Sequence, residues 1–159
     1  MNNLLLTILF FVASPNLFAS GAPASFQEIA RNSDGIVKLM SQNQAFGYCA
    51  KLGNRLPSAR ELTQLAMSLG TRGIVDSCGS DDYCYQVKVK NIDGSSDSFK
   101  FSYAGYQRPP ADNPDSNRFW SSSVGSPGAS NGIVLYGDEG YVDLVGRDSQ
   151  EAVRCVSGR

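Results

Sequence analysis

Four cysteines constrain what this chain can fold into more than any other feature of its sequence: Cys49, Cys78, Cys84 and Cys155. An even number of cysteines in an exported chain predicts disulfides, here two. Four cysteines allow three pairings, and the sequence alone does not choose among them. The short spacing of Cys78 and Cys84 favours a local bridge, with Cys49 then joined to Cys155. The alternative, a zinc site of four thiolates, is disfavoured because no two cysteines have the two-residue spacing of such sites.

The N-terminus indicates export into an oxidising compartment. Residues 4–13 are almost wholly apolar, and Ser14-Pro15-Asn16 and a stretch of small residues follow them. This order is typical of a secretory signal peptide, and the run is shorter than the roughly 20 apolar residues that span a bilayer. We predict a protein that does not span a membrane after signal cleavage and resides in the periplasm, at the cell surface or outside the cell. Cleavage after Ala19 is favoured over cleavage after Ala24, which predicts a signal peptide over residues 1–19, a lead-in segment over 20–39 and one domain over 40–159.

Composition excludes several classes of function. The chain has no histidine, so a His-based catalytic triad and a His-metal site are excluded within it. Its 14 Lys and Arg nearly balance 15 Asp and Glu, for a formal net charge of -1. A general nucleic-acid binder needs a basic face that displaces counterions from phosphates, so no nucleic-acid partner is expected.

Two helices are expected in the first half of the domain. Residues 40–52 carry apolar side chains near helical spacing and end at Gly53-Asn54. The second helix begins at a capping box, in which the Ser58 oxygen accepts from the Glu61 amide and the glutamate side chain accepts from the Ser58 amide. Behind the box, apolar residues repeat at the intervals of an amphipathic helix that ends at Gly70: Leu62, Leu65, Ala66 and Leu69. We expect this stripe to pack on the core.

After Gly73 the apolar period changes from 3.6 to 2, which indicates strands. Residues 85–89 and 99–103 alternate on either side of a polar turn, which predicts a hairpin with one aromatic face. A Pro-rich loop follows over residues 107–117, and further short strands are expected over 119–124, 132–136, 141–145 and 152–156. Two helices followed by a run of antiparallel strands predict an α+β fold.

Four short motifs also resemble a known family. They are Ala45-Phe46-Gly47-Tyr48-Cys49, then Arg55-Leu56-Pro57-Ser58-Ala59-Arg60-Glu61-Leu62, then Trp120-Ser121-Ser122-Ser123, and finally Val153-Arg154-Cys155-Val156. In this order they resemble the A-x-x-Y-C, R-L-P-(S/T)-x-x-E-L, W-(S/T)-S-S and V-R-C-V motifs of a bacterial domain that also forms the C-terminal domain of a collagen-like adhesin. That domain is similar to the C-type-lectin-like superfamily, which includes the intimin and invasin tip domains and the formylglycine-generating enzymes.

The resemblance implies a C-type-lectin-like fold, with two helices flanking a twisted antiparallel sheet. It also implies a disulfide from the first helix to the last strand, which again pairs Cys49 with Cys155. By the same resemblance, Trp120 would stand at the start of a central strand. A core position is the favoured interpretation of this tryptophan, and stacking on a ligand is the alternative.

No enzyme activity and no catalytic residue are expected. Formylglycine-generating enzymes use a reactive cysteine pair late in the chain, and Cys155 is the only late cysteine here. No spacing singles out the two carboxylates that a glycosidase needs. The serine cluster at residues 121–123 lacks a histidine base.

No cofactor is expected either, with calcium as the alternative. Asn113-Pro114-Asp115 resembles the Glu-Pro-Asn and Gln-Pro-Asp tripeptides of calcium-dependent lectins, and its oxygens suit a hard cation. The Trp-Asn-Asp partner motif of those lectins is missing, because serines follow Trp120. Residues 91–97 have the alternating polar side chains of an EF-hand loop without its glycine and terminal glutamate, so they are interpreted as a hairpin turn.

The segment between Tyr103 and Trp120 is the best candidate for a ligand surface, because it mixes aromatic rings with hydrogen-bonding groups. The predicted ligand-binding residues are Tyr103, Tyr106, Arg108, Asp112, Asn113, Asp115, Asn117 and Trp120. We expect an adhesin-like binding module that recognises a carbohydrate or a cell-surface protein. The alternative is an envelope structural or assembly protein that binds another protein.

Overall fold

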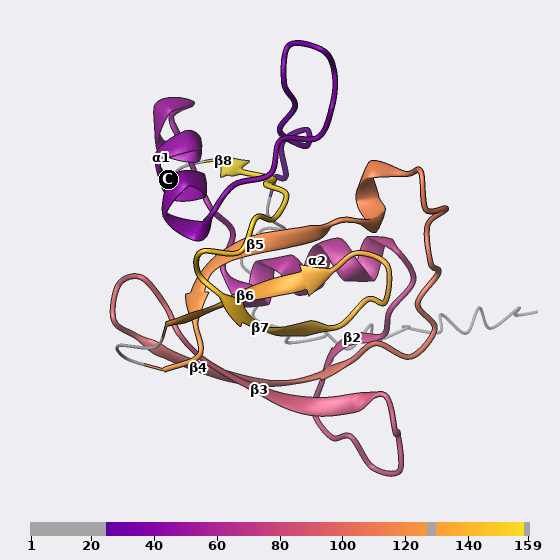
Figure 1. Cartoon of the computed structure of the whole chain (residues 1–159). Coiled ribbons are helices and arrows are strands. Elements are labelled where there is room, and N and C mark those ends of the chain that lie inside the picture. The colour runs from indigo at the N-terminus through magenta and orange to yellow at the C-terminus, as the bar shows by residue number, and fades with distance from the viewer. Residues whose placement is uncertain (1–24, 127–129, 158–159) are drawn as a thin grey trace, which may run out of the picture.

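The structure is a computed structural model that describes residues 25–126 and 130–157 (Figure 1). The predicted signal peptide over residues 1–19 lies outside the described residues. The elements are α1 (Gln42–Lys51), β1 (Asn54–Arg55), α2 (Ala59–Ser68), β2 (Gly73–Val75), β3 (Cys84–Lys90), β4 (Ser96–Ser102), the 3-10 helix η1 (Pro114–Ser116), β5 (Arg118–Val124), β6 (Asn131–Tyr136), β7 (Val142–Gly146) and β8 (Val156–Ser157). Two helices and antiparallel sheets confirm the predicted α+β class.

The strands form two sheets, and the larger one carries the domain. Its six strands have the order β2-β4-β3-β5-β6-β7 and pair antiparallel throughout, while β1 and β8 form a separate two-stranded ribbon. β3 meets β5 only at the pair Lys90 and Val124. The β3–β4 hairpin and the β5–β6–β7 part therefore diverge away from that pair, as the lower half of Figure 1 shows.

α2 lies against the larger sheet because the predicted apolar stripe faces it (Figure 1). Leu62, Leu65 and Ala66 are buried, and they pack in one cluster with hairpin residues such as Phe99 and Phe101. The hairpin register places Val87 opposite Phe99 and Tyr85 opposite Phe101, which keeps the alternating apolar side chains on one face. The amphipathic helix and the aromatic hairpin face are thus the two sides of one core.

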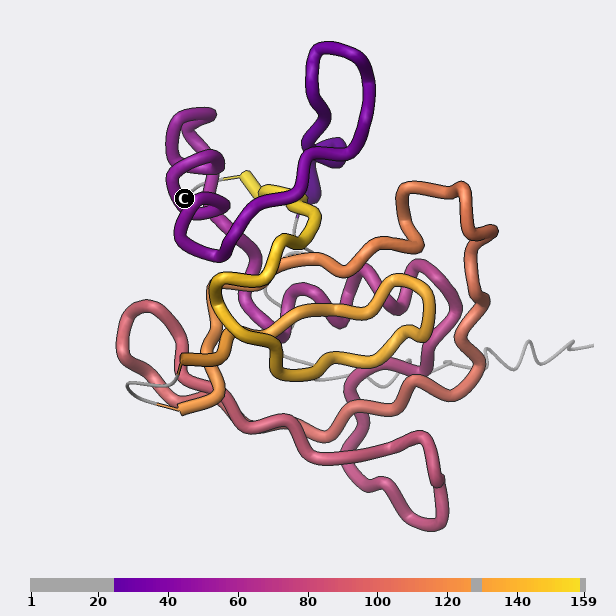
Figure 2. Tube along the Cα trace, viewed as in Figure 1, coloured from indigo at the N-terminus to yellow at the C-terminus, as the bar shows by residue number. Residues whose placement is uncertain are grey.

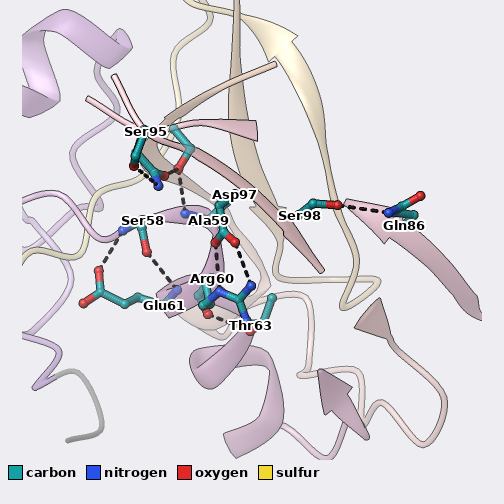
Figure 3. Close-up of polar contacts among 11 residues, drawn as sticks. Ser58, Ala59, Arg60, Glu61, Thr63, Gln86, Ser95, Asp97 and Ser98 are labelled. Carbon is teal, nitrogen blue, oxygen red and sulfur yellow. Dashed lines mark hydrogen bonds and ion pairs between the residues drawn. The ribbon is translucent and has the colours of Figure 1, made fainter. Parts of the chain in front are cut away.

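The start of α2 has the predicted capping box and is further tied to β4 (Figure 3). The Ser58 amide donates to Glu61 at 2.8 Å and the Glu61 amide donates to the Ser58 hydroxyl at 3.2 Å. Arg60 forms two hydrogen bonds to the Asp97 carboxylate, of 2.8 and 2.7 Å. These bonds from Arg60 lower the pKa of Asp97. The same pair links the first turn of the helix to the beginning of β4.

Both predicted disulfides are present, with the predicted pairing. Cys49 joins Cys155, and Cys78 joins Cys84. The long-range bridge ties α1 to the residue before β8 and lies in a second buried cluster with Leu56, Trp120, Val134 and Val153. The short bridge closes the loop that enters β3.

The C-terminal strand is shorter than predicted. A strand was expected over residues 152–156, but only Val156–Ser157 pairs as β8. The preceding residues instead accept hydrogen bonds from the N-terminal segment, Val153 from the Ala30 amide at 2.9 Å and Cys155 from the Gln27 amide at 2.8 Å. Figure 2 shows these two segments side by side. Residues 26–30 of the predicted lead-in thereby pack on the domain, with Ile29 and Ala30 buried.

A buried glutamine holds an irregularity between β5 and β6, where the register shifts between Trp120 and Val124. Gln42 is fully buried, and its amide nitrogen donates to the carbonyls of Ser121 at 2.9 Å and Ser123 at 3.2 Å. Its oxygen accepts from Arg147 Nε at 2.7 Å. The side chain therefore satisfies backbone groups that regular strand pairing would otherwise satisfy.

Replacing Gln42 with leucine should lower the free energy of unfolding by about 2–3 kcal/mol, because two buried carbonyls and one guanidinium lose a partner. Urea denaturation measures the change. Asn43→Leu is the matched control, since Asn43 is exposed and also contacts Arg147, at 2.9 Å; its effect should stay below about 1 kcal/mol. Equal midpoints for Gln42→Leu and the unchanged protein would contradict the assigned role.

Candidate ligand-binding groove

A groove of about 600 Å³ lies where three segments of the chain meet. It is lined by residues before β3, after β4 and between β6 and β7: Tyr83, Tyr103, Ala104, Gly105, Tyr106, Asp138, Glu139 and Tyr141. We call it the tyrosine groove. It lies on the side where the two parts of the larger sheet diverge, so the sheet topology itself leaves room for it.

A tyrosine behind the groove joins these two parts. The Tyr85 hydroxyl on β3 donates to the Val142 carbonyl at 2.6 Å and accepts from the Val142 amide at 2.8 Å, on β7. Burial is the main cause of the raised pKa of this hydroxyl. These two bonds join β3 to β7 at the end of the sheet where β3 and β5 do not pair.

The tyrosine rings of the groove support one another. The Tyr83 and Tyr103 rings meet edge to face with centroids 5.3 Å apart, and Tyr103 is 5.8 Å from Tyr141. Tyr141 in turn stacks on Tyr136 at 4.6 Å, and the Arg118 guanidinium lies 5.3 Å from the centre of the Tyr136 ring. Ring pairs of this kind stabilise by about 0.5–1.5 kcal/mol each. The groove wall is therefore a connected aromatic surface.

Tyr106 fastens the loop after β4 to the turn between β6 and β7. Its hydroxyl donates to the Gly137 carbonyl, and its ring lies so close to Gly140 that a side chain there would collide with it. Gly140 also has a φ of 80°, a conformation that favours glycine. Burial, with the nearby charge of Asp138, raises the pKa of Tyr106 to about 12.

The turn between β6 and β7 places two carboxylates beside the rings. Neither Asp138 nor Glu139 belongs to an ion pair within residues 25–126 and 130–157. Asp138 Oδ1 is buried without a hydrogen-bond partner. Burial raises the pKa of Tyr141, and a hydrogen bond to Glu139 raises it further. The groove thus combines aromatic surface with negative charge.

Only two of the residues predicted from sequence line this groove, Tyr103 and Tyr106. Arg108 and Asp112 are exposed on the loop that follows and do not line it. Asn117 is half-buried and donates to the Pro114 carbonyl at 2.9 Å, so its amide supports the loop. The structure brings together the first part of the predicted segment and not the rest.

The lectin-like tripeptide is engaged within its own loop. Asn113 Oδ1 accepts from the Asp115 amide at 2.8 Å and caps the 3-10 helix η1. Asp115 forms an ion pair with Arg154. Among the described residues, no group of three or more His, Cys, Asp or Glu side chains is placed to hold a metal ion. In this arrangement both side chains act as loop supports.

Trp120 is fully buried, in the second core cluster. Its indole nitrogen donates to the Met40 carbonyl at 2.7 Å. The ring has no exposed face that a ligand could stack on, which agrees with the core interpretation rather than with a place in the ligand surface.

Sequence reasoning missed four residues of the groove: Tyr83, Asp138, Glu139 and Tyr141. Tyr83 directly precedes Cys84. The other three belong to the Gly137-Asp138-Glu139-Gly140 turn and the residue after it. From the sequence, this segment is predicted only as a turn between two strands. The available signal was a turn with adjacent acids followed at once by a tyrosine. The turn lines the groove only because the fold brings it next to the loop after β4.

Comparison of the chain with protein-family models, with curated proteins and with solved structures gives no match. Within the described ranges, no helix has the length and apolar character needed to cross a membrane. Support for a function therefore comes from the groove and its surroundings.

Proposed function

We propose that this protein is an exported, non-catalytic binding module, with a C-type-lectin-like domain that takes a carbohydrate into the tyrosine groove. The observation that carries the proposal is an open groove with four tyrosine rings and two carboxylates that form no ion pair with any described residue. Tyrosine offers an apolar face and a polar hydroxyl at once. The C–H faces of a sugar ring can stack on the tyrosine rings, and the sugar hydroxyls can donate hydrogen bonds to the carboxylates.

Three features of the chain support the export and the fold in this proposal. Two disulfides are typical of proteins in oxidising compartments. The apolar N-terminal run is typical of a secretory signal peptide and so also indicates export. The two helices around an antiparallel sheet, and the disulfide from α1 to the C-terminal segment, agree with what the resemblance implies. An adhesin-like role at the cell surface or in the periplasm is consistent with such a module.

Replacing Tyr83 with alanine should weaken carbohydrate binding about five- to tenfold, because one ring face of the groove is lost. Tyr83 is 56% exposed, so the change should leave folding nearly intact. The ligand is first found by applying the oxidised mature protein to a broad glycan array, with calcium and again with EDTA. The best glycan is then titrated calorimetrically into both proteins.

Tyr48→Ala is the matched control, since this half-buried tyrosine on α1 lies outside the groove. Binding that survives EDTA and falls only in Tyr83→Ala is the expected result. Binding that is lost in EDTA would point to calcium at Asn113 and Asp115 instead. A blank array would contradict the carbohydrate proposal and favour a protein partner.

A further inference from the structure

The charge of the tyrosine groove is unbalanced. Its described lining residues include Asp138 and Glu139 and no Lys or Arg. The arginines on neighbouring elements are already paired: Arg72 with Asp81, Arg118 with Glu151 and Arg154 with Asp115. Arg108 is close enough to oppose the rise in the pKa of Tyr106, but it is exposed and forms no ion pair among the described residues. Within the part of the chain that the structure describes, the two groove carboxylates are therefore left without a cation.

One oxygen of the Asp138 carboxylate has no partner among the described residues. This Oδ1 atom is buried, and no described residue donates a hydrogen bond to it. A charged group in such a position is unfavourable unless an opposite charge comes near. A cation in the adjoining groove would supply that charge, whereas an acidic ligand would be repelled.

The rings add a second attraction for the same kind of group. Four tyrosines line the hollow, and the faces of aromatic rings carry the negative part of the ring quadrupole. Ammonium groups bind to such faces, most strongly where water is excluded. An aromatic wall beside unpaired carboxylates is therefore complementary to an ammonium group and not only to neutral sugar hydroxyls.

We propose that the ligand of the tyrosine groove carries an ammonium group, held between the tyrosine rings and the Asp138 and Glu139 carboxylates. The proposal rests on the carbohydrate-binding function above and narrows its ligand class. Two sources supply this chemistry: an amino sugar with a free amine, and a glycan substituted with a quaternary ammonium such as choline. Both ligands are positively charged. In the amino sugar the charged nitrogen is bonded to the sugar ring, and in the substituted glycan it belongs to the substituent.

The test compares two tetrasaccharides of equal length, one of glucosamine with free amines and one of N-acetylglucosamine, with choline as a third probe. Each is titrated into the full oxidised protein in mildly acidic buffer, in which the amines are protonated. The free-amine tetramer or choline should bind about tenfold more tightly than the acetylated tetramer. Asp138→Asn should remove most of that preference, because it should lower the affinity for the free-amine tetramer or choline far more than the affinity for the acetylated tetramer.

Asp148→Asn is the matched control, because it makes the same change of charge at an exposed turn beside Arg147, outside the groove. If Asp138→Asn does not fold, Glu139→Gln makes the equivalent change at an exposed residue of the same wall. Tight binding by the free-amine tetramer alone identifies an amino sugar. Tight binding by choline identifies the quaternary ammonium source.

Equal binding of the two tetramers, with choline inactive, would overturn the ammonium proposal and leave carbohydrate binding standing. A preference that persists in both Asp138→Asn and Glu139→Gln would overturn it as well. If none of the three probes binds, the ammonium proposal fails, and the glycan array separately decides whether the carbohydrate function fails with it.

Discussion

Removing the Cys49–Cys155 disulfide by the double substitution to alanine should lower the free energy of unfolding by about 4–5 kcal/mol. The bridge spans a sequence separation of 106 residues, and loop-closure entropy grows with the length of the loop that is closed. Alanine is chosen because Cys49 and Cys155 are both buried, where serine would add an unpaired hydroxyl. Guanidinium denaturation of the oxidised proteins measures the effect.

The second disulfide provides the matched comparison. Cys78 and Cys84 are only six residues apart, so the same entropy relation gives about 2 kcal/mol for their removal. This bridge, however, ends at Cys84, the first residue of β3, next to Tyr83 of the groove. We expect Cys78→Ala with Cys84→Ala to weaken ligand binding more than the other double variant does, although it destabilises less.

These two readouts separate stability from function. If the long bridge stabilises the domain and the short one positions Tyr83, the variant without the long bridge should lose more stability. The variant without the short bridge should lose more ligand affinity. An equal loss of stability in both would contradict the entropic account of the long bridge. An unchanged affinity without the short bridge would show that the other contacts of Tyr83, with Asp81 and Tyr103, are enough to hold it.

Local rules predicted the parts of the fold whose causes are local. The capping box at Ser58 and Glu61 is a contact between residues three positions apart, and the helix follows from it. The alternation along β3 and β4 likewise places Val87 and Phe99 on the buried face. A second capping box, at Ser41 and Gln44, has the same spacing and could have been identified in the same way.

The parts that sequence missed depend on partners far away in the chain. The segment around Val153 is not a regular strand, because Ala30 of the lead-in takes its carbonyl. Asp138 resembles any turn residue until Tyr106, more than thirty positions earlier, packs against the same turn. No periodicity reports such meetings, so six of the eight residues predicted to bind a ligand lie outside the tyrosine groove.

Trp120 gives the second large effect, and it distinguishes the two interpretations of this residue. Trp120→Ala should lower the free energy of unfolding by about 3–5 kcal/mol, because it leaves a cavity in the cluster around the long disulfide. Trp120→Phe keeps most of the volume and loses the hydrogen bond to the Met40 carbonyl, so it should lose about 1–3 kcal/mol. Thermal and guanidinium unfolding measure both variants.

Ligand affinity, measured well below the unfolding midpoint, completes the comparison. If Trp120 is a core residue, Trp120→Phe should bind the ligand as the unchanged protein does, and Tyr83→Ala should show the reverse pattern of weak binding and normal stability. A stacking role for Trp120 would instead give Trp120→Ala a normal midpoint and little binding. The full burial of this ring and the 56% exposure of Tyr83 are the reasons for expecting the first outcome, since only an accessible ring can exchange water for a ligand.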